Sequence, residues 1–290
     1  MLADRLDLIQ QALGRIEARQ TASVRAGDFA SAEFKVSSQW GEDGIIEHLV
    51  RHVPIEREIF VEFGVQDYRE ANTRFLLMNR NWAGLVIDGS PENISVVKRD
   101  SIYWRFNLKA ECAFITRDNI DQMITGQGIS GDIGLLSVDI DGNDYWVWEA
   151  IRSVSPRVVV AEYNALFGAT ATVSVPYDPA FQRNQAHYSN LYWGCSLAAL
   201  VHLGKAKGYT LVGCNSAGNN AFFVRNDVSG QLSAQDSAIA FRPAKFRESR
   251  NEDGSLSFVG PEQAIDTIGH LTLTNVTDGS QILVGELSRF

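Results

Sequence analysis

Features that mark membrane, secreted and nucleic-acid-binding proteins are scarce in this sequence. Among its 290 residues are only three cysteines, Cys112, Cys195 and Cys214, and no two of them have C-x-x-C spacing. The longest apolar runs, such as residues 157–161, are far shorter than the roughly 20 residues of a membrane span. The net charge is −9 and no stretch is strongly basic, whereas binding to a nucleic-acid backbone takes clustered Lys and Arg. We therefore predict a cytoplasmic protein with reduced thiols, no membrane span and no nucleic-acid partner.

The first twenty residues also lack the apolar core of a secretory signal peptide. They carry instead a series of apolar residues at alternating spacings of four and three, the a and d positions of a coiled coil: Leu2, Leu6, Ile9, Leu13 and Ile16. This pattern predicts a helix over residues 2–20, within an N-terminal segment of residues 1–25. Two heptads are too few for an independent coiled coil. The helix must therefore pack on something, and a second copy of the chain in a homo-oligomer is preferred over its own domain.

Alternating strand and helix patterns fill residues 30–240, and 45% hydrophobic content is enough for a full core. Strands are expected at about 58–64, 83–88, 102–107, 133–139 and 157–163, and helices at about 42–53, 70–80, 92–99, 117–125, 144–153 and 196–207. Two further strands, near 209–214 and 221–225, are joined by the turn-rich residues 215–220. Because that connection is short, the two strands must be antiparallel. The pattern predicts an α/β domain of five βα units that ends in an antiparallel hairpin.

Residues 241–290 have a different composition. The first twenty are charged and poor in apolar residues, and a β-hairpin with a turn at Asp278-Gly279 is expected after them. We interpret this part as a C-terminal β-hairpin extension, for which an oligomer contact is one role.

Two residues at predicted strand ends suit a bound nucleoside. Gly64 follows the first strand and Asp88 ends the second, and in parallel α/β sheets ligands bind beyond the carboxyl ends of the strands. Glycine permits close approach of a ligand, and a carboxylate accepts hydrogen bonds from both ribose hydroxyls. A dinucleotide pyrophosphate loop is not indicated, because G-x-G-x-x-G is absent. The alternatives are an ordinary turn at Gly64 and a helix cap at Asp88.

Carboxylates also gather after the fourth and fifth predicted strands. Asp139 and Asp141 follow the fourth strand, and Glu162 and Asn164 follow the fifth. Adjacent strand ends converge on one crevice, where several carboxylates repel one another unless a cation or protons are present. An all-oxygen set suits Mg²⁺ or another hard divalent cation. Without a metal, Asp139 would orient a cofactor, Asp141 and Asp144 would cap the next helix, and Glu162 would be hydrogen-bonded locally.

Four segments together resemble the FkbM-type S-adenosylmethionine-dependent methyltransferases over roughly residues 36–228. Residues 38–46 resemble the S-Q-x-G-x-D segment, residues 60–64 the first cofactor motif, residues 135–142 the K-I-D-V-E-G segment and residues 158–162 the acidic end of the fifth strand. Ser137 stands where Lys is usual and Asp141 where Glu is usual. The resemblance implies a Rossmann-like class I methyltransferase fold with seven strands, the last one antiparallel.

The resemblance also implies roles for single residues. Asp139 would lie near the methyl-bearing sulfonium, and Asp88 would hold the ribose. The remaining predicted cofactor-binding residues are Glu62 and Gly64 on the methionine part, Gln39 and Asp43 closing over the cofactor, Asn72 on the methionine carboxylate, Ser90 beside Asp88, and Asn107 near the adenine.

The predicted function is O-methylation of a hydroxyl on a sugar, glycan or small natural product. Asp139, Glu162 and Asn164 would bind a divalent cation or the acceptor hydroxyl, with Asp141 or His187 as the general base. His187 belongs to a long segment between the fifth strand and its helix, in which Tyr188, Tyr192 and Trp193 either stack on a sugar ring or pack the segment onto the domain.

Two rival functions stay open on the sequence alone. Residues 139–142 match the D-x-D-G motif of haloacid dehalogenase-type phosphatases, although that fold expects the motif on its first strand. A non-catalytic nucleoside-binding or assembly protein would use the N-terminal helix and the C-terminal hairpin as its working parts.

Overall fold

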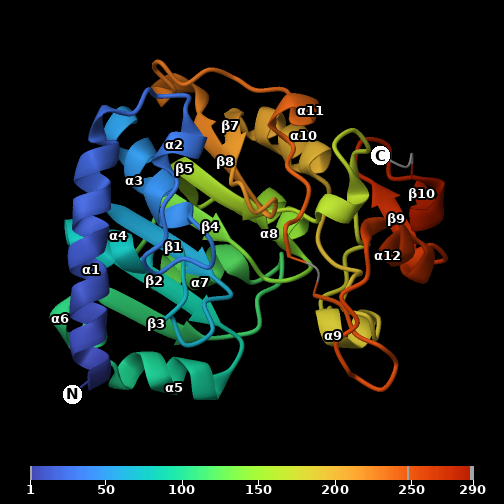
Figure 1. Cartoon of the computed structure of the whole chain (residues 1–290), viewed down its shortest axis with the longest axis horizontal. Helices are drawn as coiled ribbons and strands as arrows, with labels where there is room; N and C mark the ends of the chain where they lie inside the picture. Colours follow the sequence, from blue (N-terminus) through green and yellow to red (C-terminus); the bar gives the residue numbers. More distant parts are fainter. Residues whose placement is uncertain (1, 247, 288–290) are drawn as a thin grey trace.

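The protein is described from a computed structural model, which covers residues 2–246 and 248–287, with side chains from residue 5 onward. Its centre is a seven-stranded sheet of order β3-β2-β1-β4-β5-β8-β7 (Figure 1). The strands are β1 (Ile59–Phe63), β2 (Ala83–Asp88), β3 (Leu108–Cys112), β4 (Gly131–Val138), β5 (Val154–Glu162), β7 (Tyr209–Cys214) and β8 (Asn220–Arg225). Strands β1 to β5 are parallel, and β8 is antiparallel to both β5 and β7. The predicted α/β fold with a sheet of seven strands, of which the last in the chain is antiparallel, is confirmed.

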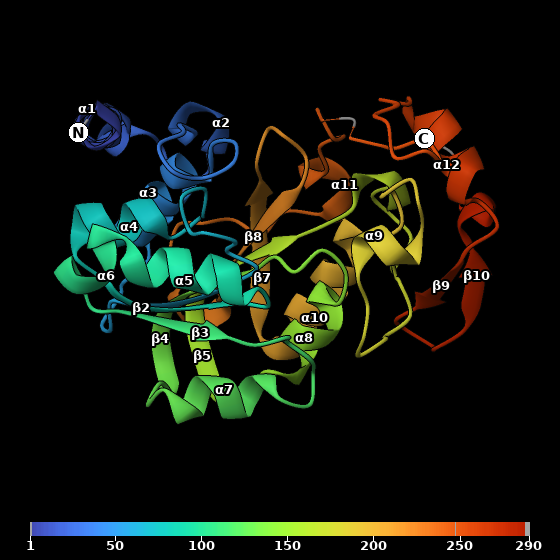
Figure 2. The ribbon, with the colours of Figure 1, turned by 90° about the horizontal axis from the view of Figure 1, so that it is seen from below.

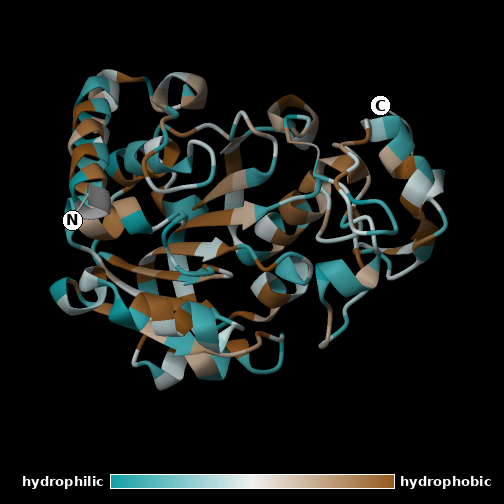
Figure 3. Ribbon diagram, turned by 60° about the horizontal axis from the view of Figure 1, so that its bottom comes forward, coloured by the Kyte–Doolittle hydropathy of each residue, from teal (hydrophilic) through white to brown (hydrophobic). Residues whose placement is uncertain are grey.

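Helices cover both faces of this sheet (Figure 2). One face is covered by α3 (Glu42–His52), α4 (Arg74–Arg80), α5 (Pro91–Arg99) and α6 (Ser101–Arg105), and the other by α7 (Ile120–Gly126), α8 (Asp144–Ala150) and α10 (Leu197–Lys207). Because both faces are buried, apolar residues predominate in the central strands and do not alternate with polar ones. Figure 3 accordingly shows long brown, hydrophobic stretches along the sheet.

The third strand was predicted wrongly at residues 102–107. That stretch is α6, which begins where the Asp100 side chain accepts a hydrogen bond from the backbone N–H of Ile102 at 3.0 Å. Its aromatic residues resemble a strand in composition, but Ile102 is buried while Trp104 is 74% exposed, as on a helix at the protein surface. The strand itself begins six residues later, at Leu108.

Helix α1 (Leu2–Gln20) confirms the predicted N-terminal helix, and it lies along one side of the domain (Figure 1). Its inner face is polar or small: Gln11 is 8% exposed and a Cβ at Gly14 would meet Val36 at 2.4 Å. The apolar series lies on the outer face, where four of its members are about half exposed: Leu6, Ile9, Leu13 and Ile16. The side chain of Leu2 lies outside the described residues.

The C-terminal extension builds a second, three-stranded sheet of order β10-β9-β6. The predicted hairpin is confirmed as β9 (Thr272–Asn275) and β10 (Gln281–Leu283). The sequence did not reveal the third strand, β6 (Val173–Ser174), which belongs to the insertion between β5 and α10, nor helix α12 (Pro261–Ile268). A hydrophobic cluster that includes Leu191, Ile265 and Leu273 joins the extension to the insertion.

Short elements complete the chain. They are α2 (Phe29–Ala32), α9 (Arg183–Ala186) and α11 (Ser237–Ala240), with 3₁₀ turns at Thr21–Ser23, Ala165–Phe167, Asn226–Val228 and Val284–Glu286. In the part of the chain that the structure describes, every helix falls short of the length and apolar character that a membrane crossing needs.

Candidate active site

A cavity of about 210 Å³ lies at the carboxyl ends of β1 to β4. We call it the nucleoside cavity, after the ligand that the sequence predicts at these strand ends. It is lined by Gly64, Gln66, Ile87, Asp88, Gly89, Ala113, Phe114, Ile115, Asp139, Ile140, Asp141, Asn143 and Phe181. Three predicted cofactor-binding residues, Gly64, Asp88 and Asp139, therefore come together here, at the edge of the sheet where ligands of such folds bind.

The Asp88 carboxylate accepts hydrogen bonds from several nearby donors. Its Oδ2 accepts a hydrogen bond from the backbone N–H of Gln66 at 2.7 Å, and its Oδ1 accepts from Ser90 N at 2.8 Å and Asn93 Nδ2 at 3.0 Å. A carboxylate has about four lone-pair sites, so these three bonds leave it capacity for a ligand hydroxyl. Ser90 contributes as the N-cap of α5, and it is not among the residues that line the cavity.

The loops around the nucleoside cavity hold unusual backbone conformations. Gln66 and Asp141 have φ values of 48° and 56°, in the left-handed region that favours glycine and that few other residues adopt. Gly64 has a φ of 70°, and a Cβ there would lie 1.7 Å from the carbonyl oxygen of Asp139. Strained residues of this kind cluster at ligand sites, where the surrounding structure enforces them. Gly64 thus lets the β1 and β4 ends approach each other closely.

Three carboxyls gather beside this cavity. Ligand atoms of Asp139, Asp144 and Glu162 all lie within 4.8 Å of one another. Strand register explains why Asp139 and Glu162 are neighbours. Val138 of β4 pairs with Ala161 of β5, and Asp139 and Glu162 are the residues that follow them. Burial, and then the nearby charges of Asp141 and Asp144, raise the pKa of Asp139 well above its usual value. Burial, and then the charge of Asp139, do the same to the pKa of Glu162.

Glu162 carries the least satisfied oxygen of this cluster. It is 6% exposed, and among the described residues no N–H or O–H group donates to its Oε2. Asp144 is better supported, since it accepts hydrogen bonds from Ile140 N at 2.7 Å and Gly142 N at 2.9 Å and so holds the turn into α8. Burial raises the pKa of Asp144 to about 6. The cluster therefore favours a proton or a cation between its members.

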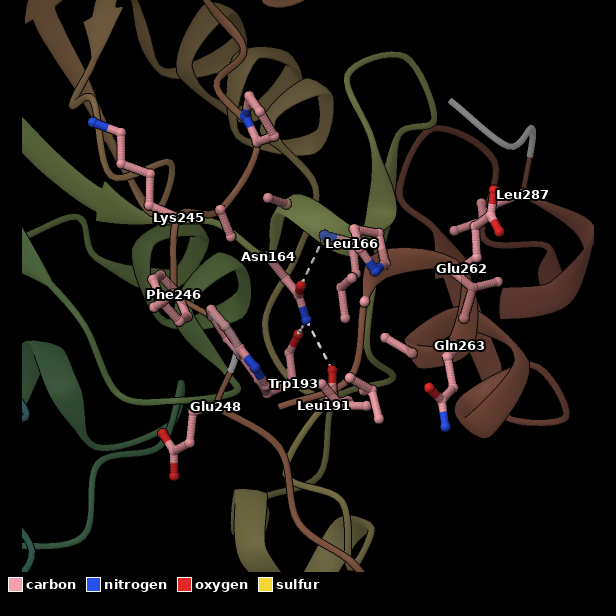
Figure 4. Close-up of a pocket in the computed structure, with 18 of the residues that line it drawn as sticks. Asn164, Leu166, Leu191, Trp193, Lys245, Phe246, Glu248, Glu262, Gln263 and Leu287 are labelled. Carbon is pink, nitrogen blue, oxygen red and sulfur yellow. Dashed lines mark hydrogen bonds between the residues drawn. The ribbon is translucent and has the colours of Figure 1, made fainter. Parts of the chain in front are cut away.

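Asn164 does not join the carboxyl cluster. Its Nδ2 donates to the carbonyl oxygens of Leu191 at 3.1 Å and Trp193 at 3.0 Å, and its Oδ1 accepts from Leu166 N at 3.0 Å (Figure 4). The buried amide thus fixes the insertion to the end of β5. Asp144, and not Asn164, is the third member of the cluster with Asp139 and Glu162.

Asp141 is held by an arginine that the sequence reading missed. Arg183 Nη1 lies 2.6 Å from Asp141 Oδ1, and the guanidinium lies over the ring of Trp193 at 4.8 Å. Its Nε donates to the carbonyl oxygen of Asn190 at 2.8 Å. The signal was present, because Arg183 is the single Lys or Arg between residues 163 and 196, in the segment that faces several carboxylates.

His187 does not line the nucleoside cavity. Its Nδ1 is 2.7 Å from Ser189 Oγ, and its ring packs against Tyr188 and lies 5.8 Å from that of His270 in the extension. Burial lowers the pKa of His187. Three aromatic residues were candidates for stacking on a sugar ring. Tyr192 is buried and its hydroxyl donates a hydrogen bond to Thr272 O, whereas Tyr188 is exposed. Trp193 lines a second, larger cleft.

The other predicted cofactor-binding residues shape loops around the site. Asp43 accepts from the N–H groups of residues 36, 37 and 38, each at 2.7 Å, and Gln39 is exposed. Glu62 accepts from Asn72 N at 2.8 Å and from the hydroxyl of Thr73. Burial raises the pKa of Glu62 to about 7 and that of Asp43 to about 6. None of these residues lines the nucleoside cavity.

Asn107 was predicted near the adenine and is in the wrong place for it. Because the third strand begins at Leu108, Asn107 precedes the strand and is exposed at its amino end, the opposite edge of the sheet. The residues that do follow β3 and line the cavity are Ala113, Phe114 and Ile115. The error follows directly from reading helix α6 as the strand.

A larger cleft of about 1020 Å³ opens beside the carboxyl cluster. We call it the large cleft (Figure 4). Asn164 to Leu166 at the end of β5, Arg183, Leu191 and Trp193 of the insertion, and residues of the C-terminal extension line it. Arg183 of this cleft and Asp141 of the nucleoside cavity are in contact, so the two spaces are neighbours.

No protein-family model and no curated protein matches the chain. Similar solved structures include the N-terminal domain of EvdMO1 with SAH bound (11% identity, TM-score 0.42, 64% of this chain and 80% of that chain covered). Others are an S-adenosylmethionine-dependent methyltransferase from Clostridium acetobutylicum ATCC 824 (11%, 0.40, 63% and 90%) and a putative O-methyltransferase from Klebsiella pneumoniae (12%, 0.40, 75% and 99%). At these values the likenesses carry no conclusion about function, which we infer from the residues of the site.

Proposed function

We propose that the protein is an S-adenosylmethionine-dependent O-methyltransferase of the FkbM type that acts on a hydroxyl of a sugar, glycan or small natural product. The observation that carries the proposal is the nucleoside cavity, which has the Asp88 carboxylate on one side and the Asp139 carboxyl on the other. That pair of acids at the ends of β2 and β4 suits a ribose at one end and a cationic sulfur at the other.

The residues present fit the cofactor. Asp88 has acceptor capacity left for ribose hydroxyls, and Phe114 and Ile115 offer an apolar surface for a base. The volume of 210 Å³ is below the about 300–1,000 Å³ of pockets for whole ligands, so the nucleoside fills the cavity and the amino-acid part extends beyond it. When bound, S-adenosylmethionine supplies a methyl group on a positively charged sulfur.

The chain's own residues then have to orient and deprotonate an alcohol. Asp139 and Glu162 share one crevice, and burial raises the pKa of both, so one of them keeps a proton while the other is free to accept one from the acceptor hydroxyl. Asp141 is already paired with Arg183, and His187 lies outside both cavities. In this proposal the carboxyl pair is the general base, and Asp141 positions Arg183.

A divalent cation such as Mg²⁺ is the second way to relieve repulsion in the cluster. Asp139, Asp144 and Glu162 offer three oxygen ligands, and Oε2 of Glu162 receives no donor from the described residues. If the cation is needed, excess EDTA abolishes methyl transfer and added Mg²⁺ restores it. Full activity in EDTA leaves the shared proton as the explanation. Calorimetric titration of Mg²⁺ into the protein and into Glu162→Gln reports the same site without an activity assay.

Calorimetry with S-adenosylmethionine and S-adenosylhomocysteine tests the proposed function directly. Binding of both in the micromolar range is expected, and the absence of any binding contradicts the proposal. The rival phosphatase needs its D-x-D-G motif on the first strand, and here Asp139 follows β4, the fourth. If the protein is instead a non-catalytic assembly protein, no methyl group is transferred to any hydroxyl, even when the cofactor is bound.

A further inference from the structure

The C-terminal extension lines the large cleft on two sides, with Lys245, Phe246 and Glu248 on one side and Glu262, Gln263 and Leu287 on the other (Figure 4). Most of the residues that line the cleft come from residues 241–246, residue 248 and residues 259–265. The end of β5 and the insertion, which includes Arg183 and Trp193, supply the rest of the lining. The cleft therefore exists because the chain after β8 folds back across the carboxyl ends of the strands.

The segment of residues 241–246, which we call the strap, is fixed at several points. The backbone N–H of Lys245 donates to Ala217 O at 2.8 Å, and its Nζ donates to Ser216 Oγ at 2.8 Å. Phe246 stacks on Trp40, with ring centroids 5.8 Å apart and an angle of 16° between the planes. The turn between β7 and β8 and the loop before α3 thus hold this wall of the cleft in place.

The cleft adjoins the nucleoside cavity at one ion pair. Arg183 lines the cleft, Asp141 lines the cavity, and their charged atoms are 2.6 Å apart. A methyl acceptor must bring its oxygen to within about 3–3.5 Å of the methyl carbon. With the cofactor in the nucleoside cavity, the adjoining large cleft is where an acceptor can lie beside it.

The lining of the cleft combines charged and apolar side chains. Arg183 lies next to the nucleoside cavity, and Glu248 is 3.9 Å from it. Leu191, Ile265 and Leu287 belong to the hydrophobic cluster that joins the extension to the insertion, and Glu262 also lines the cleft. The volume of about 1020 Å³ lies at the upper end of the range for small-molecule pockets, far above the need of a single sugar ring.

We propose that the large cleft binds the methyl acceptor, and that this acceptor is a bulky amphiphilic alcohol with a hydroxyl-bearing head beside Arg183 and an apolar body against Leu191, Ile265 and Leu287. The proposal rests on the proposed function, because methyl transfer is what makes the neighbouring space an acceptor site. A free monosaccharide leaves the apolar wall in water and gains no hydrophobic stabilisation from it, so it binds weakly.

The test compares one alkyl glycoside with its free sugar. n-Octyl β-D-glucoside, below the concentration at which it forms micelles, and D-glucose are titrated separately into the protein by calorimetry. The test variant is Gln263→Trp, because the exposed Gln263 on α12 lines the cleft and a tryptophan there fills it without touching the core. The matched control is Gln281→Trp, the same substitution at an exposed position of β10 that does not line the cleft.

We expect the octyl glucoside to bind at least tenfold more tightly than glucose, Gln263→Trp to lose at least tenfold in that affinity, and Gln281→Trp to keep it. No binding of the octyl glucoside, or equal binding by the two variants, overturns the proposal. S-adenosylhomocysteine is titrated into the same three proteins. If S-adenosylhomocysteine binds but Gln263→Trp does not change the affinity for the glucoside, the acceptor site is wrong and the proposed function stands. Its failure to bind removes the proposed function, whatever the cleft holds.

Discussion

Asp88 and Glu162 are both buried carboxyls at strand ends, and their surroundings suit them to different tasks. Asp88 accepts hydrogen bonds from two backbone N–H groups and from the side-chain amide of Asn93. Glu162 faces other carboxyls instead, and burial raises its pKa. A carboxylate that is surrounded by donors and has acceptor capacity left can bind ribose hydroxyls, whereas one with a raised pKa can exchange a proton with an alcohol near neutral pH.

Replacement of Asp88 by asparagine is expected to weaken S-adenosylhomocysteine binding by about 10- to 100-fold, the equivalent of about 1.5–3 kcal/mol for a hydrogen bond to a charged group. Calorimetry well below the melting temperature measures it. The control is Asp67→Asn, because Asp67 lies in the loop between β1 and α4 and does not line the nucleoside cavity. An unchanged affinity in Asp88→Asn contradicts the ribose role of this residue.

The pKa of Glu162 predicts how stability depends on pH. Because the pKa in the folded state lies above the ordinary 4.5, the native protein holds this proton to higher pH than the unfolded chain. Stability is therefore lost as pH rises above about 4.5 toward the folded-state pKa. Glu162→Gln removes this loss, so its melting temperature should exceed that of the wild type by a margin that grows with pH, about 2–4 °C for each kcal/mol relieved.

Glu162→Gln should also lower kcat for methyl transfer by about 10²- to 10⁴-fold, the usual contribution of a general base. Thermal melts from pH 4 to 9 and initial rates measure the two effects. Glu149→Gln, an exposed position on α8, serves as the control and should change neither. A melting temperature of Glu162→Gln below that of the wild type at every pH contradicts the like-charge interpretation of the cluster.

At the scale of elements, the site depends on how closely the ends of β1 and β4 approach each other. Gly64 combines a positive φ with direct contact between its backbone and that of Asp139. Gly128 also has a positive φ, of 74°, but a Cβ there would meet nothing within 4 Å. The two glycines therefore separate the cost of the backbone conformation from the cost of the contact.

Gly128→Ala is expected to cost about 1–2 kcal/mol, the penalty of a left-handed conformation alone. Gly64→Ala should cost clearly more, because Asp139 and the end of β4 must move, and it should weaken S-adenosylhomocysteine binding at least tenfold. Urea denaturation gives the free energies of unfolding, and calorimetry gives the affinities. Equal costs for the two variants would contradict the close approach of β1 and β4 as the reason for glycine at position 64.

At the scale of the whole molecule, α1 presents its apolar residues to solvent. Its polar and small side chains, such as Gln11 and Gly14, face the domain, which is the reverse of an ordinary surface helix. An exposed apolar series at a and d spacing is typical of a helix that pairs with another. We therefore keep the prediction of a homo-oligomer that uses Leu6, Ile9, Leu13 and Ile16.

The prediction is tested with a double variant, Ile9→Gln with Leu13→Gln. The 32.1 kDa chain is expected to sediment as a dimer, and the double variant as a monomer. The matched control is Arg15→Gln with Arg19→Gln, two exposed positions of the same helix outside the apolar series. A monomeric wild type at micromolar concentration would show that α1 has another partner or none.

Much of the fold followed from the sequence because strand and helix periods are local. The apolar runs that became β1, β2, β4 and β5, and the short turn between β7 and β8, predict the sheet and its antiparallel end. Aromatic residues near Trp104 defeated the same reasoning, since composition alone does not distinguish a short surface helix from a strand. That one error moved the predicted adenine contact from residues 113–115 to Asn107.

The sequence by itself determined which strand ends carry Gly64, Asp88, Asp139 and Glu162, because parallel strands place successive ends at one edge of the sheet. Only the tertiary structure decided which of those groups meet, since that depends on strand register and on where the chain returns. Register brings Asp139 to Glu162, and the fold of the insertion brings Arg183 to Asp141. The extension closes the large cleft through contacts between residues far apart in the chain, and local sequence patterns do not encode such contacts.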